Sequence, residues 1–218
     1  MTPARQRQLA VNLPPLRLDP STLPGDLRQL FDAPVSDIWM EIGFGAGEHL
    51  AGQAARHPDI GFIGCEPFVN GVASLLSMVD DQGLSNVRLF DDDVRLLLPA
   101  LTDASIGRLY ILFSDPWPKT RHHRRRITVP ENLGHFARLL RPGGELRFAT
   151  DQPEFAAWSL QRLLREPRLH WLAKSKADWS TAPNDWIETR YETKARSRGL
   201  KPIYLNFRRP FEEPLKAA

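Results

Sequence analysis

Five short apolar segments alternate with stretches of helical periodicity, and this alternation limits the possible folds more than any other feature of the sequence. The segments that predict strands are DIWMEI (37–42), IGFIGC (60–65), NVRLF (86–90), RLYILFS (108–114) and ELRFAT (145–150). Between the second and the third, apolar residues recur at helical spacing at Val69, Val72, Ala73, Leu76 and Val79. Strands separated by helices are typical of parallel sheets. We therefore expect an α/β protein whose mostly parallel sheet carries helices on both faces.

The C-terminal half predicts two further helices and two further strands. Thr128-Val129-Pro130-Glu131 has the pattern of a capping box with a proline in the first turn, and it predicts a helix through Leu140. The segment RPGG (141–144) ends that helix, and residues 155–164 form the next one. Residues 186–209 (WIETRYETKARSRGLKPIYLNFRR) predict two strands around a basic loop, which brings the expected sheet to seven strands.

Residues 1–36 contain six prolines and little periodicity, so we expect an N-terminal arm with one short helix, followed by a single domain over residues 37–218. The composition, 42% hydrophobic and 25% charged, is that of a globular protein. A single cysteine, Cys65, excludes an intramolecular disulfide and fits a reducing compartment. Because no signal-peptide pattern and no membrane-spanning apolar run occurs, we predict a cytoplasmic protein without a membrane partner.

A glycine-rich loop, EIGFGAGEHL (41–50), follows the first predicted strand and opens a helix. Its glycines, Gly43, Gly45 and Gly47, allow a ligand to approach the backbone closely. A dinucleotide-binding loop would have Gly or Ala at position 48, where Glu48 would repel a pyrophosphate, and the P-loop lysine is absent. Glu41, two residues before the first glycine, suits a cationic ligand instead. S-adenosylmethionine, with its sulfonium and ammonium groups, fits this pattern.

Two further acids follow predicted strands at the edge where open α/β sheets bind ligands. Glu66 ends the second strand, where a carboxylate can accept from both hydroxyls of a ribose; a helix-start acid is the alternative interpretation. Asp93 follows the third strand and can accept from an adenine amino group. The neighbouring Asp91 and Asp92 leave open a simple solvated acidic turn.

The segment FSDPWPKTRHHRRR (113–126) places one carboxylate, Asp115, beside a dense run of cations. Pro116 and Pro118 stiffen the turn. The basic strip that follows consists of Lys119, Arg121, Arg124, Arg125 and Arg126. Beside a strand end such a strip suits nucleic-acid phosphates, whereas a charge run elsewhere is usually a solvated face. Trp117 suits stacking on an extruded base and, equally, packing in the interior. His122 and His123 are adjacent and lack a carboxylate or cysteine partner, so we expect no metal site.

Five segments occur in a fixed order: EIGFGAGEHL, GCEPF, FSDPWPKTRHHRRRI, LRPGGELRFATD and ETRYETKARSRGLKPIY. Together, over residues 37–208, they resemble the bacterial tRNA (guanine-N7-)-methyltransferases, and the block DPWPK-x-RH-x-RRR is highly specific. The resemblance implies a Rossmann-like class I methyltransferase fold and S-adenosyl-L-methionine as the cofactor. It also implies methylation of a guanine in the tRNA variable loop to N7-methylguanosine.

The resemblance further implies roles for individual residues. The cofactor-binding residues are Glu41, Gly43, Gly45, Gly47, Glu66, Asp93 and Asp115, and Asp115 is also the candidate catalytic residue. The substrate-binding residues are Lys119, Asp151, Thr189, Arg190, Tyr191 and Glu192. The position of the basic strip, rather than the resemblance, makes Arg121, Arg124, Arg125 and Arg126 the candidates for tRNA phosphates. A helix cap is the alternative interpretation of Asp151, and the sequence leaves open a monomer or a homodimer.

The expected chemistry depends on orientation. Guanine N7 has a lone pair and no proton, so its attack on a methyl carbon requires no general base, and holding the reactants in line is the expected catalytic contribution. A carboxylate at position 115 can accept from the guanine N1–H and amino group, or offset the charge that grows on the ring. Two rivals are another S-adenosylmethionine enzyme, acting on rRNA or a small nucleophile, and a non-catalytic RNA-binding module. The presence of Glu41, Asp115 and all the loop glycines disfavours the latter.

Overall fold

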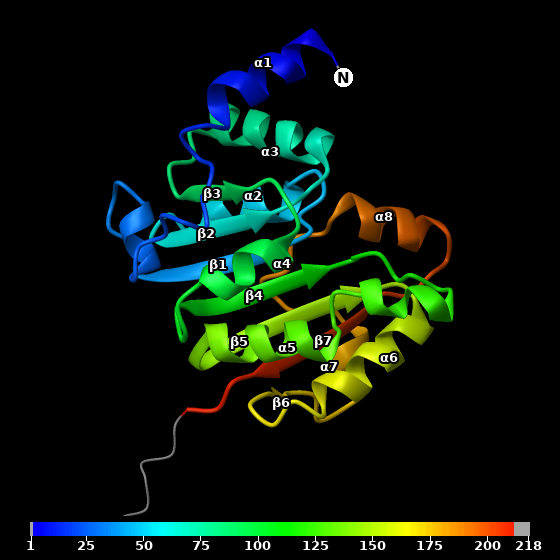
Figure 1. Ribbon diagram of the computed structural model, residues 1–218. Coiled ribbons are helices and arrows are strands. Elements are labelled where there is room, and N and C mark those ends of the chain that lie inside the picture. Colours follow the sequence, from blue (N-terminus) through cyan, green and yellow to red (C-terminus); the bar gives the residue numbers. More distant parts are fainter. Residues whose placement is uncertain (1, 212–218) are drawn as a thin grey trace, which may run out of the picture.

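The computed structural model describes residues 2–211 and contains one seven-stranded sheet (Figure 1). The strands are β1 (Asp37–Ile42), β2 (Ile60–Cys65), β3 (Val87–Phe90), β4 (Ile106–Leu112), β5 (Leu140–Thr150), β6 (His170–Trp171) and β7 (Ile203–Arg208). Their spatial order is β3-β2-β1-β4-β5-β7-β6. β1 to β5 pair in parallel, and β7 runs antiparallel between β5 and β6. This confirms the predicted seven-stranded, mostly parallel sheet.

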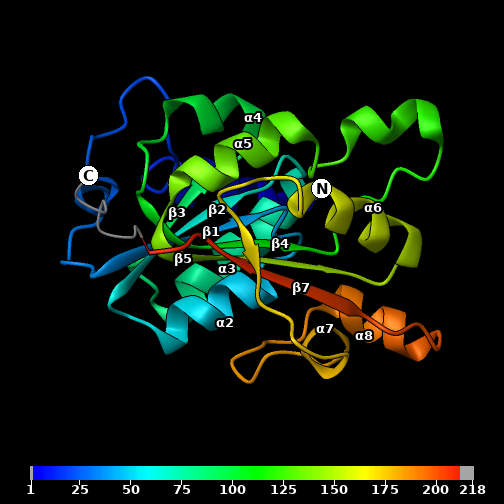
Figure 2. The same cartoon turned by 90° about the horizontal axis from the view of Figure 1, so that it is seen from below.

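Helices cover both faces of the sheet, with α4, α5 and α6 on one side and α2, α3 and α8 on the other (Figure 2). The α-helices are α1 (Pro3–Asn12), α2 (Glu48–Arg56), α3 (Val69–Gln82), α4 (Val94–Leu97), α5 (Pro130–Leu139), α6 (Pro153–Leu163), α7 (Ala177–Ser180) and α8 (Arg190–Ser197). Three short 3-10 helices add η1 (Leu27–Leu30), η2 (Leu98–Ala100) and η3 (Thr120–Arg125).

The period of two along each strand divides the apolar side chains between two cores. In β1, Ile38 and Met40 pack into the core beneath α4, α5 and α6, whereas Trp39 belongs to the core beneath α2 and α3. β2 is buried along its whole length, as a central parallel strand covered on both faces must be. The central strands are therefore held by packing on both faces, and they fix where the loops at their carboxyl ends begin.

The prediction of two strands in residues 186–209 was wrong, because the first of them is helix α8. Thr189 begins this helix, and its hydroxyl accepts a hydrogen bond from the Glu192 backbone N–H at 3.1 Å, so T-R-Y-E is a capping motif. The remaining strand of the seven is the two-residue β6, which the sequence analysis did not identify.

The predicted capping box at residues 128–131 does not form, although the helix does. Val129 is the residue before α5 and makes no side-chain cap, while the Thr128 hydroxyl bonds to Ser159 at 2.8 Å. The helix ends at Leu139 rather than at Leu140, because Leu140 already belongs to β5. The predicted RPGG turn lies inside that strand, where Gly143 takes a φ of 79°.

The N-terminal segment packs closely against the rest of the chain. α1 lies along α3 (Figure 1), and Leu18, Leu27, Phe31 and Val35 are buried in the larger core. The division at residue 36 stays a prediction, and the last seven residues of the expected domain, 212–218, lie outside the described part of the chain. In residues 2–211, no helix has both the length and the apolar character needed to cross a membrane.

Candidate methyl-transfer site

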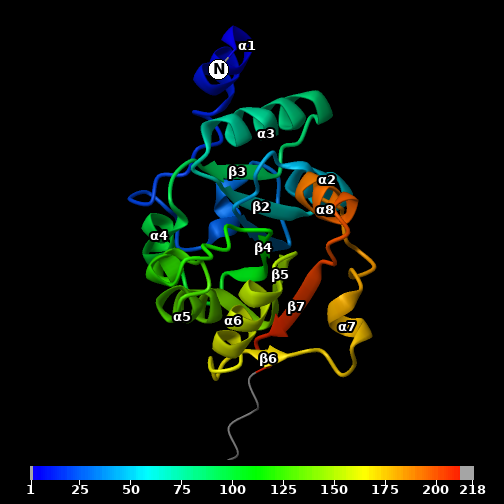
Figure 3. The same ribbon diagram turned by 90° about the vertical axis from the view of Figure 1, so that its right-hand side faces the viewer.

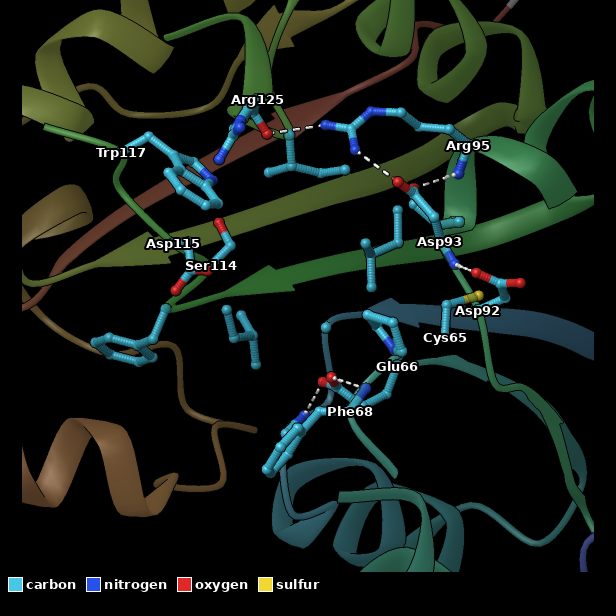
Figure 4. A pocket seen from close by; sticks show the side chains of 18 of the residues that line it. Cys65, Glu66, Phe68, Asp92, Asp93, Arg95, Ser114, Asp115, Trp117 and Arg125 are labelled. Atoms are coloured by element: carbon cyan, nitrogen blue, oxygen red, sulfur yellow. Dashed lines mark hydrogen bonds and ion pairs between the residues drawn. The ribbon is translucent and has the colours of Figure 1, made fainter. Parts of the chain in front are cut away.

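A cleft of about 730 Å³ opens at the carboxyl ends of β1, β2 and β4 (Figure 4). It lies where the strand order reverses: the chain runs outward from β1 through β2 to β3 and then crosses back to β4 on the other side of β1. Ligands of open α/β sheets bind at such switch points. Of the predicted cofactor-binding residues, Gly43, Gly45, Glu66, Asp93 and Asp115 line this cleft. The sheet thus brings together side chains that are up to 72 positions apart in the chain.

The three loop glycines have positive φ angles of 73°, 60° and 92°, a conformation that other residues rarely adopt. Gly43 and Gly45 expose their backbone to the cleft. Gly47 has a different function, because a Cβ there would lie 2.8 Å from Leu75 and separate α2 from α3. Gly45 approaches the ring of Tyr191, which an added Cβ would meet at 3.0 Å.

Glu66 connects the glycine loop to the end of β2. One carboxylate oxygen accepts from the Gly45 backbone N–H at 2.8 Å, and the other accepts from the Phe68 N–H at 2.9 Å (Figure 4). Burial raises the pKa of this carboxyl, and the negative charges of Asp115 and Glu41 add to the effect against the two backbone hydrogen bonds. Glu66 therefore fixes the loop backbone while it faces the cleft.

Glu41 lies behind the loop and not among the residues that line the cleft. Its side chain is 4% exposed, and its carboxylate contacts His49 Nδ1 at 2.7 Å. The hydrogen-bond network continues from His49 Nε2 to the side-chain amide of Gln53, which also donates to the Asp185 carbonyl at 2.9 Å. His49 was not among the predicted site residues. Its position in the first turn of α2, directly after the glycine loop, is the signal that could have identified it.

Asp93 ends the loop after β3 and begins α4, accepting from the Arg95 backbone N–H at 3.0 Å. Its second oxygen accepts from the Arg95 guanidinium at 2.9 Å, and the same guanidinium donates to the Arg125 carbonyl at 2.9 Å (Figure 4). Arg95, which the sequence analysis also passed over, therefore connects the acidic edge of the cleft to the basic strip.

The turn that carries Asp115 has unusual backbone angles. Phe113 and Trp117 have positive φ values of 50° and 41°, which are uncommon for residues other than glycine. Asp115 is exposed at the mouth of the cleft, between these two residues. Such a turn requires support from its surroundings.

That support comes from Arg126, which is fully buried. Its guanidinium donates to the Pro116 carbonyl at 2.7 Å and to the Trp117 carbonyl at 3.4 Å. It also forms two hydrogen bonds to Glu154 of α6, at 2.6 and 3.1 Å. This corrects the prediction of Arg126 as a phosphate ligand: its charge is already satisfied in the interior and has no surface on which to meet a phosphate.

The rest of the basic strip is at the surface. Lys119, Arg121 and Arg124 are exposed around η3, and Arg125 lies over the Trp117 ring with its guanidinium carbon 4.9 Å from the ring centroid. Trp117 and Arg125 both line the cleft. Among residues 2–211, no group of three or more histidine, cysteine, aspartate or glutamate side chains could hold a metal ion.

A second, smaller pocket of about 140 Å³ is lined by Phe113, Asp151, Tyr191, Lys194, Ala195 and Arg198. Phe113 and Tyr191 also line the main cleft, so the two pockets are neighbours. Of the other predicted substrate residues, Thr189 and Glu192 are buried in the base of α8. Arg190 lies 3.8 Å from Glu48, and Lys119 lines neither pocket.

Comparison with known proteins decides the family. A family model described as "Putative methyltransferase" matches residues 36–205. The tRNA (guanine-N(7)-)-methyltransferase of Rhodospirillum rubrum is 50% identical over 209 residues, which cover 94% of this chain and 82% of the relative. The chain belongs to the tRNA (guanine-N7-)-methyltransferase family. A second member, from Brucella abortus (strain 2308), is 46% identical over 196 residues, with 89% of this chain and 84% of that one covered.

Solved structures show that this tRNA (guanine-N7-)-methyltransferase family member has a class I methyltransferase fold. The antibiotic-resistance methyltransferase Kmr superposes with a TM-score of 0.59 at 17% identity, covering 90% of this chain and 95% of that one. The aminoglycoside resistance methyltransferase NpmB1 superposes with a TM-score of 0.57 at 18% identity, covering 86% and 94%. At these identities the likeness concerns the fold alone.

Proposed function

We propose that the protein transfers the methyl group of S-adenosylmethionine to N7 of a guanine in the variable loop of tRNA. The observation that carries the proposal is the position of Asp115, within the residues that the family model matches, at the mouth of the cleft that the glycine loop and Glu66 also line. A tRNA substrate agrees with the predicted cytoplasmic location.

The residues of the cleft fit the cofactor. The bound cofactor supplies an electrophilic methyl group on a positively charged sulfur. Glu66, Asp93 and Asp115 give the cleft the negative charge that suits such a ligand, and Gly43 and Gly45 expose backbone to it. The Ser114 hydroxyl oxygen is buried in the lining without a hydrogen-bond partner in the described residues, so a ligand group can satisfy it. Glu66 holds the ribose in this assignment, and Asp93 lies at the adenine end.

Glu41 takes a less direct part in this proposal than the sequence suggested. Its carboxylate is buried against His49, so its negative charge acts on the cleft through the glycine loop. The network from Glu41 through His49 and Gln53 to the Asp185 carbonyl holds β1, α2 and the segment before α8 together. Glu41 and His49 thereby position the loop and Tyr191 relative to each other.

The protein's own contribution to the reaction is orientation. Asp115 would accept hydrogen bonds from the guanine N1–H and amino group and so orient the base for in-line attack by N7. Arg126 is a positioning residue, because it holds the carbonyls of Pro116 and Trp117, the two residues that follow Asp115. Trp117, with Arg125 over one face, offers its ring to an extruded base.

The test is a product map. An unmodified tRNA transcript incubated with the protein and labelled S-adenosylmethionine should be cut by borohydride and aniline at one guanine in the variable loop. A transcript with adenine at that position should not be labelled. Methylation of adenine, of rRNA alone, or of no nucleotide despite cofactor binding would contradict the proposal.

The Asp115→Asn variant tests the residue assignment in the same assay. We expect turnover to fall about a hundredfold, as when one oriented polar group is removed from an active site, with little change in tRNA affinity. Asp81→Asn, an exposed carboxylate at the end of α3, is the matched control. Near-normal single-turnover rates for Asp115→Asn at saturating tRNA would remove Asp115 from the mechanism.

A further inference from the structure

Helix α8 has an inner face that is firmly held. Glu192 is 1% exposed and accepts from three groups: the Trp186 indole N–H at 2.6 Å, the Tyr204 hydroxyl at 2.5 Å and the Arg196 guanidinium at 2.6 Å. Ala195, one turn further on, is also buried. These contacts hold α8 against β7, through Tyr204, and against the segment that precedes α8, through Trp186. The position of α8 therefore does not depend on a bound ligand.

The opposite face of α8 opens onto the smaller pocket. Tyr191, Lys194 and Arg198 stand at positions i, i+3 and i+7, one above another on this side of the helix. All three line the pocket together with Asp151, which follows β5. Lys194 and Arg198 are exposed, and neither forms an ion pair within residues 2–211. Two unpaired cations thus stand beside the pocket that shares Phe113 and Tyr191 with the cleft.

The charge around α8 is strongly one-sided. Residues 190–201 hold five cations and one carboxylate, and that carboxylate, Glu192, is buried. Figure 2 shows that α8 and the loop containing η3 lie on opposite sides of the sheet, at the same end of the strands. Figure 3 views this end directly, with α8 beside α2 and the ends of β4 and β5 below it. The cleft therefore opens between two separate groups of exposed cations.

We propose that Lys194 and Arg198 form a second phosphate-binding patch, so that the RNA backbone is held on both sides of the guanine that enters the cleft. This α8 patch rests on the proposed function, because it requires an RNA substrate. A guanine between Phe113 and Tyr191 leaves its flanking phosphates outside the pocket, where the basic strip lies on one side and the α8 patch on the other. Arg196 takes no part, since Glu192 and Tyr204 already hold it.

The test compares tRNA binding by the Lys194→Ala/Arg198→Ala protein with that of the wild type over a series of salt concentrations. Removing two phosphate contacts should lower the slope of log affinity against log salt by about 1.4–1.8 and weaken binding at low salt roughly tenfold. The matched control is Lys174→Ala/Lys176→Ala, which removes two exposed cations next to α7 and should leave the slope unchanged.

Binding of S-adenosylmethionine reports on folding, and it should be the same in all three proteins. If the alanine variant binds the cofactor poorly, Lys194→Gln/Arg198→Gln keeps the polar side chains and should show the same loss of slope. An unchanged slope in a variant that binds the cofactor would overturn the α8 patch. Failure of the wild type to methylate guanine N7 in tRNA would instead overturn the proposed function, so the two outcomes are distinguishable.

Discussion

The basic segments at 119–126 and 190–201 have similar charge but use it differently. Each holds one arginine 2.6 Å from a glutamate, Arg126 from Glu154 and Arg196 from Glu192, and leaves other cations exposed at the surface. In the first pair the arginine is fully buried and the carboxylate is 63% exposed. In the second the carboxylate is buried and the arginine is half exposed.

This difference in burial gives the two arginines different roles, one near the reacting atoms and one in holding a helix. Arg126 supports the backbone of the turn that carries Asp115, so changing it reaches the reacting atoms. Arg196 supports a carboxylate that Trp186 and Tyr204 also hold, so α8 keeps most of its attachment without it. The cationic side chains of one basic segment can therefore have separate functions, and burial shows which of them support the fold and which are free to bind a ligand.

The largest expected effect is that of Arg126→Ala. The turn loses the donors to its Pro116 and Trp117 carbonyls, and a displacement of about 1 Å at Asp115 should lower turnover at saturating tRNA up to about a hundredfold. The salt dependence of tRNA binding should stay as in the wild type, because no phosphate contact is removed. Arg196→Ala is the comparison variant and should lower turnover much less.

Arg126→Lys separates positioning from folding, since it keeps the charge but cannot make the same set of hydrogen bonds. We expect it to bind S-adenosylmethionine normally and to recover only part of the turnover. A smaller salt slope for Arg126→Ala, with normal turnover, would return Arg126 to the phosphate-binding group.

A smaller effect is expected from Arg121→Ala/Arg124→Ala, which changes the two exposed arginines of η3 outside the cleft lining. The slope of log tRNA affinity against log salt concentration should fall by about 1.4–1.8. Turnover at saturating tRNA should fall far less than in Arg126→Ala. The measurement is tRNA affinity against salt, with the Lys174→Ala/Lys176→Ala protein as control. An unaltered slope would mean that this part of the basic strip is a solvated face.

The smallest effect concerns pH. The hydrogen bond from Arg126 holds the pKa of Glu154 below its ordinary value of 4.5, so the folded protein binds this proton less tightly than the unfolded chain. The stability that results is fully present above pH 4.5 and is lost as the pH falls through the lowered pKa. Glu154→Gln should therefore melt below the wild type by up to about 3 °C at pH 6, since the glutamate is largely exposed. The difference in melting temperature between the two proteins should shrink as the pH falls and Glu154 becomes protonated. A difference that stays constant from pH 6 to roughly pH 3, where the carboxyl titrates, would contradict the linkage.

Local patterns in the sequence determined most of the fold and the place of the site. Apolar runs of strand length, the helical spacing at 69–79 and the glycines at 43, 45 and 47 act through neighbours in the chain, and the structure has each element there. Placing Glu66, Asp93 and Asp115 at strand ends was enough to predict that they share an edge. Two four-residue patterns show the limit: Thr128 and Thr189 both precede a glutamate by three residues, but only Thr189 caps its helix.

What only the tertiary structure decided is which polar groups are already satisfied. The two patterns differ locally by Pro130, the first residue of α5, and they differ in the packed fold by Ser159, which lies 31 positions from Thr128 in the chain and bonds to its hydroxyl. Arg126 reads like Arg124 in the sequence until Glu154 and the carbonyls of the 116–117 turn surround it. The sequence does not indicate that the Glu41 carboxylate is buried against His49, which the fold places 2.7 Å from it. The residue type determines which hydrogen bonds a side chain can form. Its partners come from distant segments, and only the packed fold brings them within about 3 Å.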